Sequence, residues 1–299
     1  MQADLRELWN YRELLLIFVQ RDLKVRYKNS MLGFGWSLLN PLFQVLTITL
    51  VLQFLGVGQR QANYHMYVFC AMLPWLFFNT STMDSTMALV SFHHLMRRTY
   101  FPRELAPIAV VIANLIHFGL ATGVFLVYSL ANSLFWWTVL GRLDIAIQPT
   151  VLLIPIPMLG LALLVTGVAL FVSVWTLYFE DIRFILDSGM KILYWLVPVL
   201  YIGEQILLRD PWGRGKLLHT LYMLNPLAGL ITGFQRLTMV PTKLERVDPV
   251  TQQVLYSITA RMDAAHWGFM FWGVAAAALV ALAGHRYFTS RKWKLAERG

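Results

Sequence analysis

The sequence predicts an all-α, polytopic membrane protein with six transmembrane helices, an amphipathic N-terminal helix at the membrane interface, and outer re-entrant helices before the last span. Two observations lead to this prediction. Hydrophobic residues make up 58% of the 299 residues and charged residues 14%, whereas soluble domains contain about 25% charged residues. The apolar residues also occur in long blocks, and about 20 of them are needed to cross a bilayer. We therefore expect one domain overall, with residues 1–32 forming a cytoplasmic interface helix and 33–299 the six-span part.

Six apolar segments are candidates for the spans. They are approximately 33–57, 66–90, 105–131, 150–178, 190–208 and 267–284. The fifth is the least regular, because it begins near Lys191 and reaches Glu204 early. Lys and Arg are concentrated in the segments that this topology places inside the cell, as is usual for cytoplasmic loops. We therefore expect both termini in the cytoplasm.

The N-terminal segment has the pattern of a helix that lies along a membrane surface. At 100° per residue, its polar residues fall within an arc of about 100°; they are Arg6, Asn10, Glu13, Gln20, Arg21, Lys24 and Lys28. The apolar face is expected to consist of Tyr11, Leu14, Phe18 and Val25, with Ile17 as an apolar intruder among the polar residues. Such a helix places its apolar side on the membrane and its basic side toward headgroups. A simpler interpretation makes these cations an orientation signal only.

The long outer segment 202–266 contains an apolar stretch that is broken in the middle. The stretch LYMLNPLAGLITGFQRLTM (221–239) is interrupted by Asn225-Pro226, and either half is too short to cross a bilayer. Because Pro lacks a backbone N–H and ends helices, we expect a pair of re-entrant or interfacial helices on the outer face.

Several kinds of chemistry are missing from the sequence. It has no G-x-x-x-x-G-K-[ST] motif, since the nearest fragment, GRGK at 213–216, lacks the spacing and the hydroxyl residue. His93 and His94 are adjacent and would point about 100° apart on a helix, which makes a poor metal pair. Cys70 is the only cysteine, so an intramolecular disulfide is excluded. The net charge of +9 is explained by the cytoplasmic excess of cations and does not require a nucleic acid partner.

Polar and aromatic residues inside the spans are the candidates for a transport route. Asp84 lies among hydroxyl and amide residues in FNTSTMDSTM (78–87), where it could line a wet route or join helices by hydrogen bonds. Trp36 and Phe43 are seven residues apart on the first span, and Tyr194 and Tyr201 repeat that spacing on the fifth. These aromatic faces could guide a sugar polymer by stacking, or they could anchor the spans at the headgroups. The candidate channel-lining residues are Trp36, Phe43, Asp84, Tyr194 and Tyr201.

Four segments in order resemble a known family. RDLKVRYKNSMLGFGWSLLNPL (21–42) resembles the beginning of type-2 ABC exporter permeases that export bacterial polysaccharides, through Arg21-Asp22, Arg26-Tyr27, Ser30, Leu32-Gly33, Trp36 and Asn40-Pro41. LPWLFFNTS (73–81), RRTYFPRELAPIAVV (97–111) and YFEDIRFILDSGMKILYWLVPVLY (178–201), followed by LNP at 224–226, are similar to later parts of that family. Segments 132–149 and 240–266 resemble nothing known to us.

The resemblance implies a function and partners. The chain would be the membrane-spanning permease subunit of an ABC transporter in the bacterial cytoplasmic membrane. It would export an undecaprenyl-linked glycopolymer: O-antigen, capsular polysaccharide or wall teichoic acid. Two copies of the chain would assemble with two copies of a separate ATPase subunit, which binds ATP and Mg²⁺, so the chain itself would need no cofactor and would not be an enzyme.

Two groups of residues receive roles from this resemblance. The carrier lipid's diphosphate would meet the basic N-terminal residues, since Arg and Lys are the usual partners of phosphate; these are Arg21, Lys24, Arg26, Tyr27 and Lys28. The cytoplasmic turn after the second span would form a short helix with an aromatic knob that docks into the ATPase; its residues are Arg97, Arg98, Phe101, Pro102, Arg103 and Glu104. A simpler interpretation makes this turn an ordinary basic inner loop.

Three alternative functions stay open at this point. Within the same family, the chain could export a small lipid or a drug, although its compact length and its N-terminal signatures argue against this. A membrane-embedded glycosyl- or acyltransferase would need clustered acids or histidines, and only Asp84 and His93-His94 qualify. An ion-coupled secondary transporter would usually show inverted repeats and more charge inside the membrane.

Overall fold

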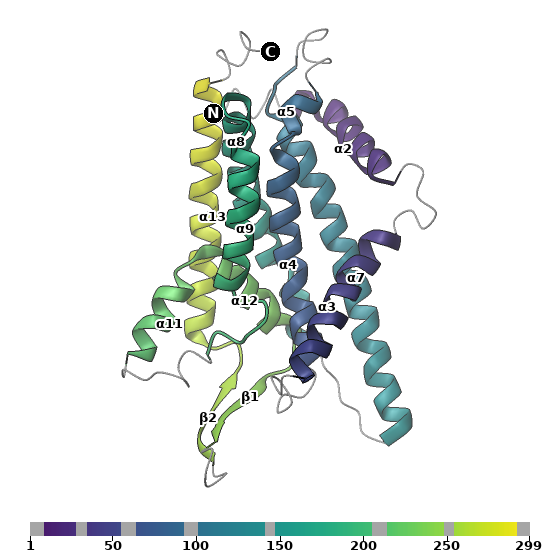
Figure 1. Ribbon diagram of the computed structural model, residues 1–299, viewed down its shortest axis with the longest axis vertical. Helices are drawn as coiled ribbons and strands as arrows, with labels where there is room; N and C mark the ends of the chain where they lie inside the picture. Colours follow the sequence, from purple (N-terminus) through teal and green to yellow (C-terminus); the bar gives the residue numbers. More distant parts are fainter. Residues whose placement is uncertain are drawn as a thin grey trace.

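A computed structural model describes residues 9–27, 35–54, 64–92, 101–140, 147–204, 214–247 and 254–291. Most of these residues are helical (Figure 1). The elements in chain order are α2 (Arg12–Tyr27), α3 (Gly35–Phe54), α4 (Tyr64–Ser85), α5 (Ala88–Ser91), α7 (Leu105–Leu140), the 3₁₀-helix η1 (Pro149–Leu153), α8 (Pro155–Tyr178), α9 (Ile182–Leu196), α11 (Gly215–Met223), α12 (Pro226–Thr238), β1 (Thr242–Val247), β2 (Val254–Ala260) and α13 (Ala264–Arg291).

The long helices α4, α7, α8 and α13 run along the length of the molecule (Figure 1). Helix α2 and the last turns of α13 lie at one end, and the β1–β2 hairpin lies at the opposite end. The main apolar core joins α4, α7, α8 and α12, and it includes large aromatic side chains such as Phe77, Phe118 and Phe234. A second apolar cluster joins α2 to α5, α7, α8 and α13.

Three of the described helices are long and apolar enough to cross a membrane: Leu105–Phe135, Pro149–Tyr178 and Ala264–Arg291. The bent pair α11–α12 makes a fourth if it is counted as one span. This confirms an apolar, mainly helical membrane protein. The fifth expected span differs from 190–208, because helix α9 covers Ile182–Leu196 and has 15 residues. At 1.5 Å per residue it reaches about 22 Å, less than the hydrocarbon thickness.

Helices α8 and α13 approach each other until their backbones touch. A Cβ atom placed on Gly167 would lie 2.5 Å from the carbonyl oxygen of Val280, and one on Gly284 would lie 2.5 Å from that of Gly167. Small residues at a helix contact allow such close packing in membranes, where the lipid gives no hydrophobic drive for helices to associate. The absence of side chains at Gly167 and Gly284 therefore allows the close contact between α8 and α13.

The break predicted at Asn225-Pro226 is present. Helices α11 and α12 meet there at a bend of 95°, Pro226 is the first residue of α12, and the side chain of Asn225 accepts a hydrogen bond from the backbone N–H of Leu227. Every residue of α12 from Leu227 to Thr238 is buried, so α12 lies inside the bundle. Burial of the whole helix is not expected of an interfacial helix, and the bent pair fits either a re-entrant loop or a broken span.

The prediction of a purely helical chain is wrong in one place. Strands β1 and β2 pair as an antiparallel hairpin, with Thr242 opposite Ala260 and Leu244 opposite Ile258. They fall within the segment 240–266 that resembled nothing. Helix α7 is also longer than the expected span 105–131, since it continues to Leu140. Both differences lie at the end of the molecule away from α2 (Figure 1).

Candidate functional site

Helix α2 is fixed to the bundle by a cluster of aromatic rings. Phe18, which is buried, lies with its ring 4.3 Å from that of Phe92 and 5.3 Å from that of Phe101. The guanidinium of Arg21 sits 4.0 Å from the centre of the Phe92 ring, a favourable cation–π distance. Helix α2 is therefore attached to the segment after α5 and to the segment before α7, as well as being amphipathic.

The predicted apolar face of α2 needs a correction. Phe18 is buried, and Tyr11 and Leu14 pack against the same cluster, as expected. Val25, however, is 63% exposed, and Val19 is buried in its place. The buried residues of α2 are thus those that contact the second apolar cluster.

Arg26 turns inward from α2 and meets two polar side chains of the bundle. Its Nη2 atom donates to Oδ2 of Asp84 at 2.7 Å, and its Nη1 atom donates to Oδ1 of Asn114 at 2.7 Å. Asn114 in turn donates through Nδ2 to Oδ2 of Asp84 at 3.0 Å. The triad joins α2, α4 and α7, with side chains of Arg26 and Asp84 that are 35% and 41% exposed. Solvent and a ligand can thus still reach it.

Two cavities open on either side of this triad. The first has a volume of about 340 Å³ and contains four charged side chains, those of Asp22, Arg26, Asp84 and Arg183. The second has a volume of about 180 Å³ and is lined in part by Arg26, Gln44, Asn114 and His117. Arg26 lines both cavities. Arginine forms paired hydrogen bonds with phosphate oxygens, and the first cavity offers two arginines for that purpose.

The charge in the first cavity depends on Asp22. Burial raises the pKa of Asp22 and the charge of Asp84 adds to the rise, against the opposing effect of Arg21 and Arg26. Protonation of this carboxyl removes one negative charge from the cavity. An anionic ligand is therefore favoured when Asp22 is neutral.

The other basic residues predicted to meet the headgroup are placed only in part. Lys24 is exposed on α2. Tyr27 ends α2, but its side chain is outside the described part, and Lys28 also lies outside the described residues. The sequence did not indicate that Arg26 would bind Asp84, since the two were assigned to different groups.

The proposed ATPase-docking turn differs from the expectation of a protruding knob. Phe101 is 5% exposed and Glu104 is also 5% exposed, and Pro102 is buried, while Arg103 is partly exposed. Phe101 contacts Phe18 of α2 instead of projecting from the molecule. Arg97 and Arg98, together with His93 and His94, lie outside the described residues.

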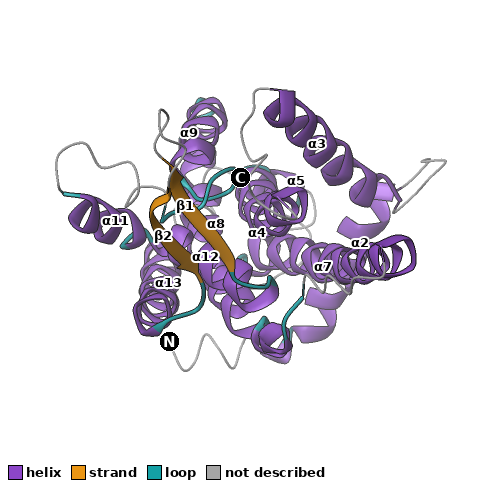
Figure 2. Ribbon diagram, turned by 90° about the horizontal axis from the view of Figure 1, so that it is seen from below, coloured by secondary structure: helices purple, strands orange, loops and turns teal. Residues whose placement is uncertain are grey.

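The aromatic residues expected along the channel belong to α3 and to the region of α9. Phe43 on α3 is 54% exposed, and the side chain of Trp36 on the same helix is not among those described. Tyr194 on α9 packs its ring 5.5 Å from that of Trp75, and the hydroxyl of Tyr201 donates to the carbonyl of Trp195. Figure 2 shows α3 and α9 on the same side of the molecule, with α4 set back between them.

A polar cluster that the sequence analysis missed lies toward the hairpin end. Glu204, Arg236 and His266 are 3%, 4% and 7% exposed, and Nη2 of Arg236 donates to both carboxylate oxygens of Glu204 at 2.8 and 2.7 Å. The Nδ1 atom of His266 is 2.6 Å from Oδ1 of Asp263. Partial burial raises the pKa of Asp263, but the backbone and side-chain hydrogen bonds to His266 lower it more, so this carboxyl has a pKa below its usual value. Only the early position of Glu204 in the fifth segment could have signalled this cluster.

Comparisons with known proteins bear on the whole chain. It is 32% identical over 232 residues to a Myxococcus xanthus protein described as O-antigen export system permease protein RfbA, a match that covers 77% of this chain and 82% of the relative. Two Klebsiella pneumoniae proteins with the same description are 28% and 26% identical, and each match covers 76% of this chain and 80% of the relative. No protein-family model matches the chain.

Proposed function

The chain belongs to the family of O-antigen export permeases, and from this premise we propose that it moves an undecaprenyl-linked O-antigen-type polysaccharide across the bacterial cytoplasmic membrane. Family membership confirms the resemblance to type-2 ABC exporter permeases. The observation that carries the proposal is the similarity to the Myxococcus xanthus permease over 232 residues. Because the relatives are named for O-antigen, this substrate takes precedence over capsular polysaccharide and wall teichoic acid.

The triad beside α2 is the proposed place where the lipid-linked substrate is first bound. Its cavities lie at the end of the bundle that carries α2, and Arg26 and Arg183 line the larger one. A diphosphate can take the place of the Asp84 carboxylate at Arg26, since both are oxygen anions that accept from a guanidinium. Binding would then free α2 from α4. The exposed cation Lys24 favours the same anionic ligand. The raised pKa of Asp22 also favours it, because this carboxyl loses its negative charge more readily than usual.

The route of the polymer is proposed along the side of the bundle that shows α3 and α9 (Figure 2). Phe43 is exposed on that route, and Tyr194 and Tyr201 belong to the α9 region. Stacking on an aromatic ring is worth roughly 1–3 kcal/mol per base in single-stranded nucleic acids, and a comparable weak contact would guide sugars without holding them. A second copy of the chain would close the route, as the resemblance implies.

Energy is proposed to come from a separate ATPase subunit. The full sequence has no P-loop, and an exporter of this kind requires ATP hydrolysis. Arg103 is the most accessible described residue of the docking turn, and the buried Phe101 would position that turn against α2. Movement of the ATPase would thus reach α2 through the Phe101–Phe18 contact. The six-span count, the homodimer and the cytoplasmic position of both termini belong to this proposal; α2 and the last turns of α13 lie at the same end of the molecule (Figure 1).

Replacement of a host's own permease gene tests the proposal. The gene is introduced with its neighbouring ATPase gene into a strain that lacks an O-antigen permease, and surface polysaccharide is measured by gel electrophoresis of lipopolysaccharide. Restored polysaccharide is expected, together with accumulation of lipid-linked polymer when the ATPase is inactivated. Robust ATP hydrolysis by the purified chain alone, or unchanged export without any ATPase, would contradict the permease assignment.

A further inference from the structure

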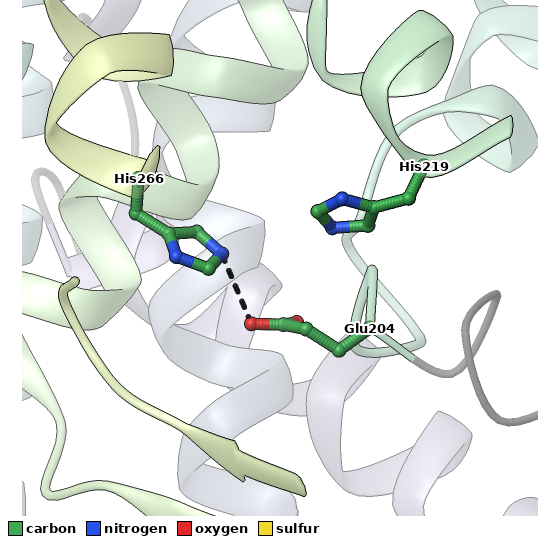
Figure 3. A group of neighbouring side chains, drawn as sticks. All are labelled: Glu204, His219 and His266. Carbon is green, nitrogen blue, oxygen red and sulfur yellow. Dashed lines mark ion pairs between the residues drawn. The ribbon is translucent and has the colours of Figure 1, made fainter. Parts of the chain in front are cut away.

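Three buried side chains from three separate elements converge at the hairpin end of the bundle. Glu204 follows α9, His219 lies on α11 and His266 lies in the first turn of α13 (Figure 3). They are 3%, 8% and 7% exposed. One possible ligand atom from each lies within 4.8 Å of those of the other two. Nothing in the export function assigned above uses this cluster.

We propose that Glu204, His219 and His266 form a site for a divalent transition metal ion with the coordination preferences of zinc. Two imidazole nitrogens and one carboxylate oxygen are a donor set that zinc takes, with a water molecule in the fourth position. The nearest pair is already suitably placed, since Nε2 of His266 is 3.1 Å from Oε1 of Glu204. Ligand atoms of a tetrahedral zinc ion are about 3.3 Å apart, so a side-chain rotation of His219 brings the third donor into place.

The surroundings of His266 are those of a metal-binding imidazole. Its Nδ1 atom lies 2.6 Å from Oδ1 of Asp263, and a carboxylate in that position fixes the proton on Nδ1. The lone pair of Nε2 is then directed toward Glu204 and His219 (Figure 3). Histidines that bind metals nearly always donate their other N–H to such a partner, which also raises the basicity of the ligand.

His219 supplies the second, independent indication of a ligand. Its Nε2 atom is fully buried and has no hydrogen-bond partner among the described residues, and its ring faces the cluster (Figure 3). An unpaired polar atom inside a protein is costly and calls for an explanation. A metal ion bound at this nitrogen provides that partner, and it also joins α11 to α13 and to the turn that contains Glu204.

The positive charge of Arg236 is the main feature that opposes binding of a cation at this cluster. Its Nη2 atom contacts both oxygens of Glu204, but a carboxylate has about four lone-pair positions and can serve an arginine and a metal together. The charges of Glu204, Asp263 and Arg236 leave the cluster one unit negative before a cation binds. A proton on His266 is the rival cation, because the ring would then donate to both carboxylates. A proton on His266 leaves the buried, unpaired Nε2 of His219 unexplained. Substitution of His219 therefore distinguishes a metal ion from a proton.

Metal binding by the full-length chain tests the inference. The protein is purified in detergent without a polyhistidine tag, treated with a chelator and titrated with Co²⁺, whose visible absorption reports tetrahedral coordination, and then with Zn²⁺ in competition. We expect one equivalent per chain. Affinity should fall by on the order of 100-fold in His219→Gln and in His266→Gln, and by about 10- to 100-fold in Asp263→Asn, as is typical of a lost supporting carboxylate. His285→Gln, at the other end of α13, is the matched control and should bind as the wild type does.

Thermal unfolding supplies a second, independent readout. Zn²⁺ should raise the unfolding midpoint of the wild type by mass action and leave that of His219→Gln unchanged. Absence of tetrahedral Co²⁺ absorption in the folded wild type would overturn the metal site, whatever the variants do. Equal binding by wild type and His219→Gln would also overturn it. A midpoint that depends on pH through His266, without any effect of metal or of His219, would assign the cluster to a proton. None of these outcomes depends on whether the chain exports O-antigen.

Discussion

Arg26 and Asp84, which are 58 residues apart in the chain, form an ion pair in which Nη2 of Arg26 lies 2.7 Å from Oδ2 of Asp84. The pair joins helix α2 to helix α4, and Arg26 lines two cavities. Two roles had been open for Asp84, that of lining a wet route and that of joining helices. Its hydrogen bonds with Arg26 and Asn114 join helices, and it also lines the larger cavity; its role in a transport route stays a prediction.

The first prediction concerns the energy of this pair. A partly exposed ion pair contributes up to about 1 kcal/mol, so Arg26→Gln and Asp84→Asn should each lower the unfolding midpoint by about 2–4 °C. The double variant should cost less than the two single costs added together, because the interaction is lost only once. Surface polysaccharide should fall in all three. Asp187→Asn is the control for loss of an ion pair, since it removes the more exposed pair with Lys191. Strictly additive losses of stability at Arg26 and Asp84 would show that these two residues are not coupled.

The second prediction concerns pH and Asp22. The pKa of Asp22 is raised, chiefly by burial, so the folded state binds its proton more tightly than the unfolded state does. The stabilisation is complete below the ordinary value of 3.8 and is lost as pH rises through the raised value. Asp22→Asn should therefore increase stability at neutral pH and flatten the dependence of the unfolding midpoint on pH above 3.8. A wild-type midpoint that rises through this range would reverse the assigned sign.

The third prediction separates two roles in the docking turn: Phe101 packs the turn against α2, and Arg103 contacts the ATPase. Phe101→Ala removes a buried ring and should cost about 3–5 kcal/mol, release α2 and expose it to proteolysis. Arg103→Ala removes a more exposed side chain and should leave stability nearly unchanged while weakening binding of the ATPase. Both effects are measured on the purified chain, by limited proteolysis and by co-purification of the ATPase. Full ATPase binding by Arg103→Ala would remove this residue from the interface.

The fourth prediction concerns the route of the polymer. Phe43→Cys should react with a small water-soluble thiol reagent in the assembled transporter, since Phe43 is 54% exposed and is proposed to face water there. Val45→Cys on the same helix is the control, because Val45 is 6% exposed and should be protected. Cys70 is fully buried, so it should contribute little background, and Cys70→Ala can remove it. Complete protection of residue 43 in every nucleotide state would place it against lipid or protein.

The fifth prediction concerns the contact of α8 with α13. Gly167→Ala and Gly284→Ala each put a Cβ atom 2.5 Å from a backbone oxygen, and overpacking of this kind typically costs 1–3 kcal/mol. The unfolding midpoint should fall accordingly. Gly119→Ala in α7 meets no atom within 4 Å and should be neutral or stabilising, because alanine favours a helix over glycine. A loss of stability at Gly119 as large as at Gly167 would point to a general intolerance of the helices to substitution.

The sequence determined the features that depend on neighbouring residues. The apolar composition fixed a membrane protein, and the lack of a backbone N–H at Pro226 fixed the break between α11 and α12. The spacing of Tyr11, Leu14 and Phe18 indicated that they share one face of α2, although that face packs on the bundle and had been expected to lie on the membrane. The ordered motifs also predicted the family that the relatives show. In each case, hydropathy, helical spacing or a single residue's backbone chemistry was sufficient.

Only the tertiary structure decided which distant groups meet. Arg26 and Asp84 looked like members of two separate sites, Phe101 looked like an exposed knob, and Glu204, His219 and His266 gave no common signal in the chain. The hairpin of β1 and β2 and the shorter α9 were likewise missed. Pairing of charges depends on how helices pack and turn about their axes, and one residue of rotation moves a side chain by 100°. Local patterns do not contain that information, because the cost of burying a charge is set by whatever partner the rest of the fold brings beside it.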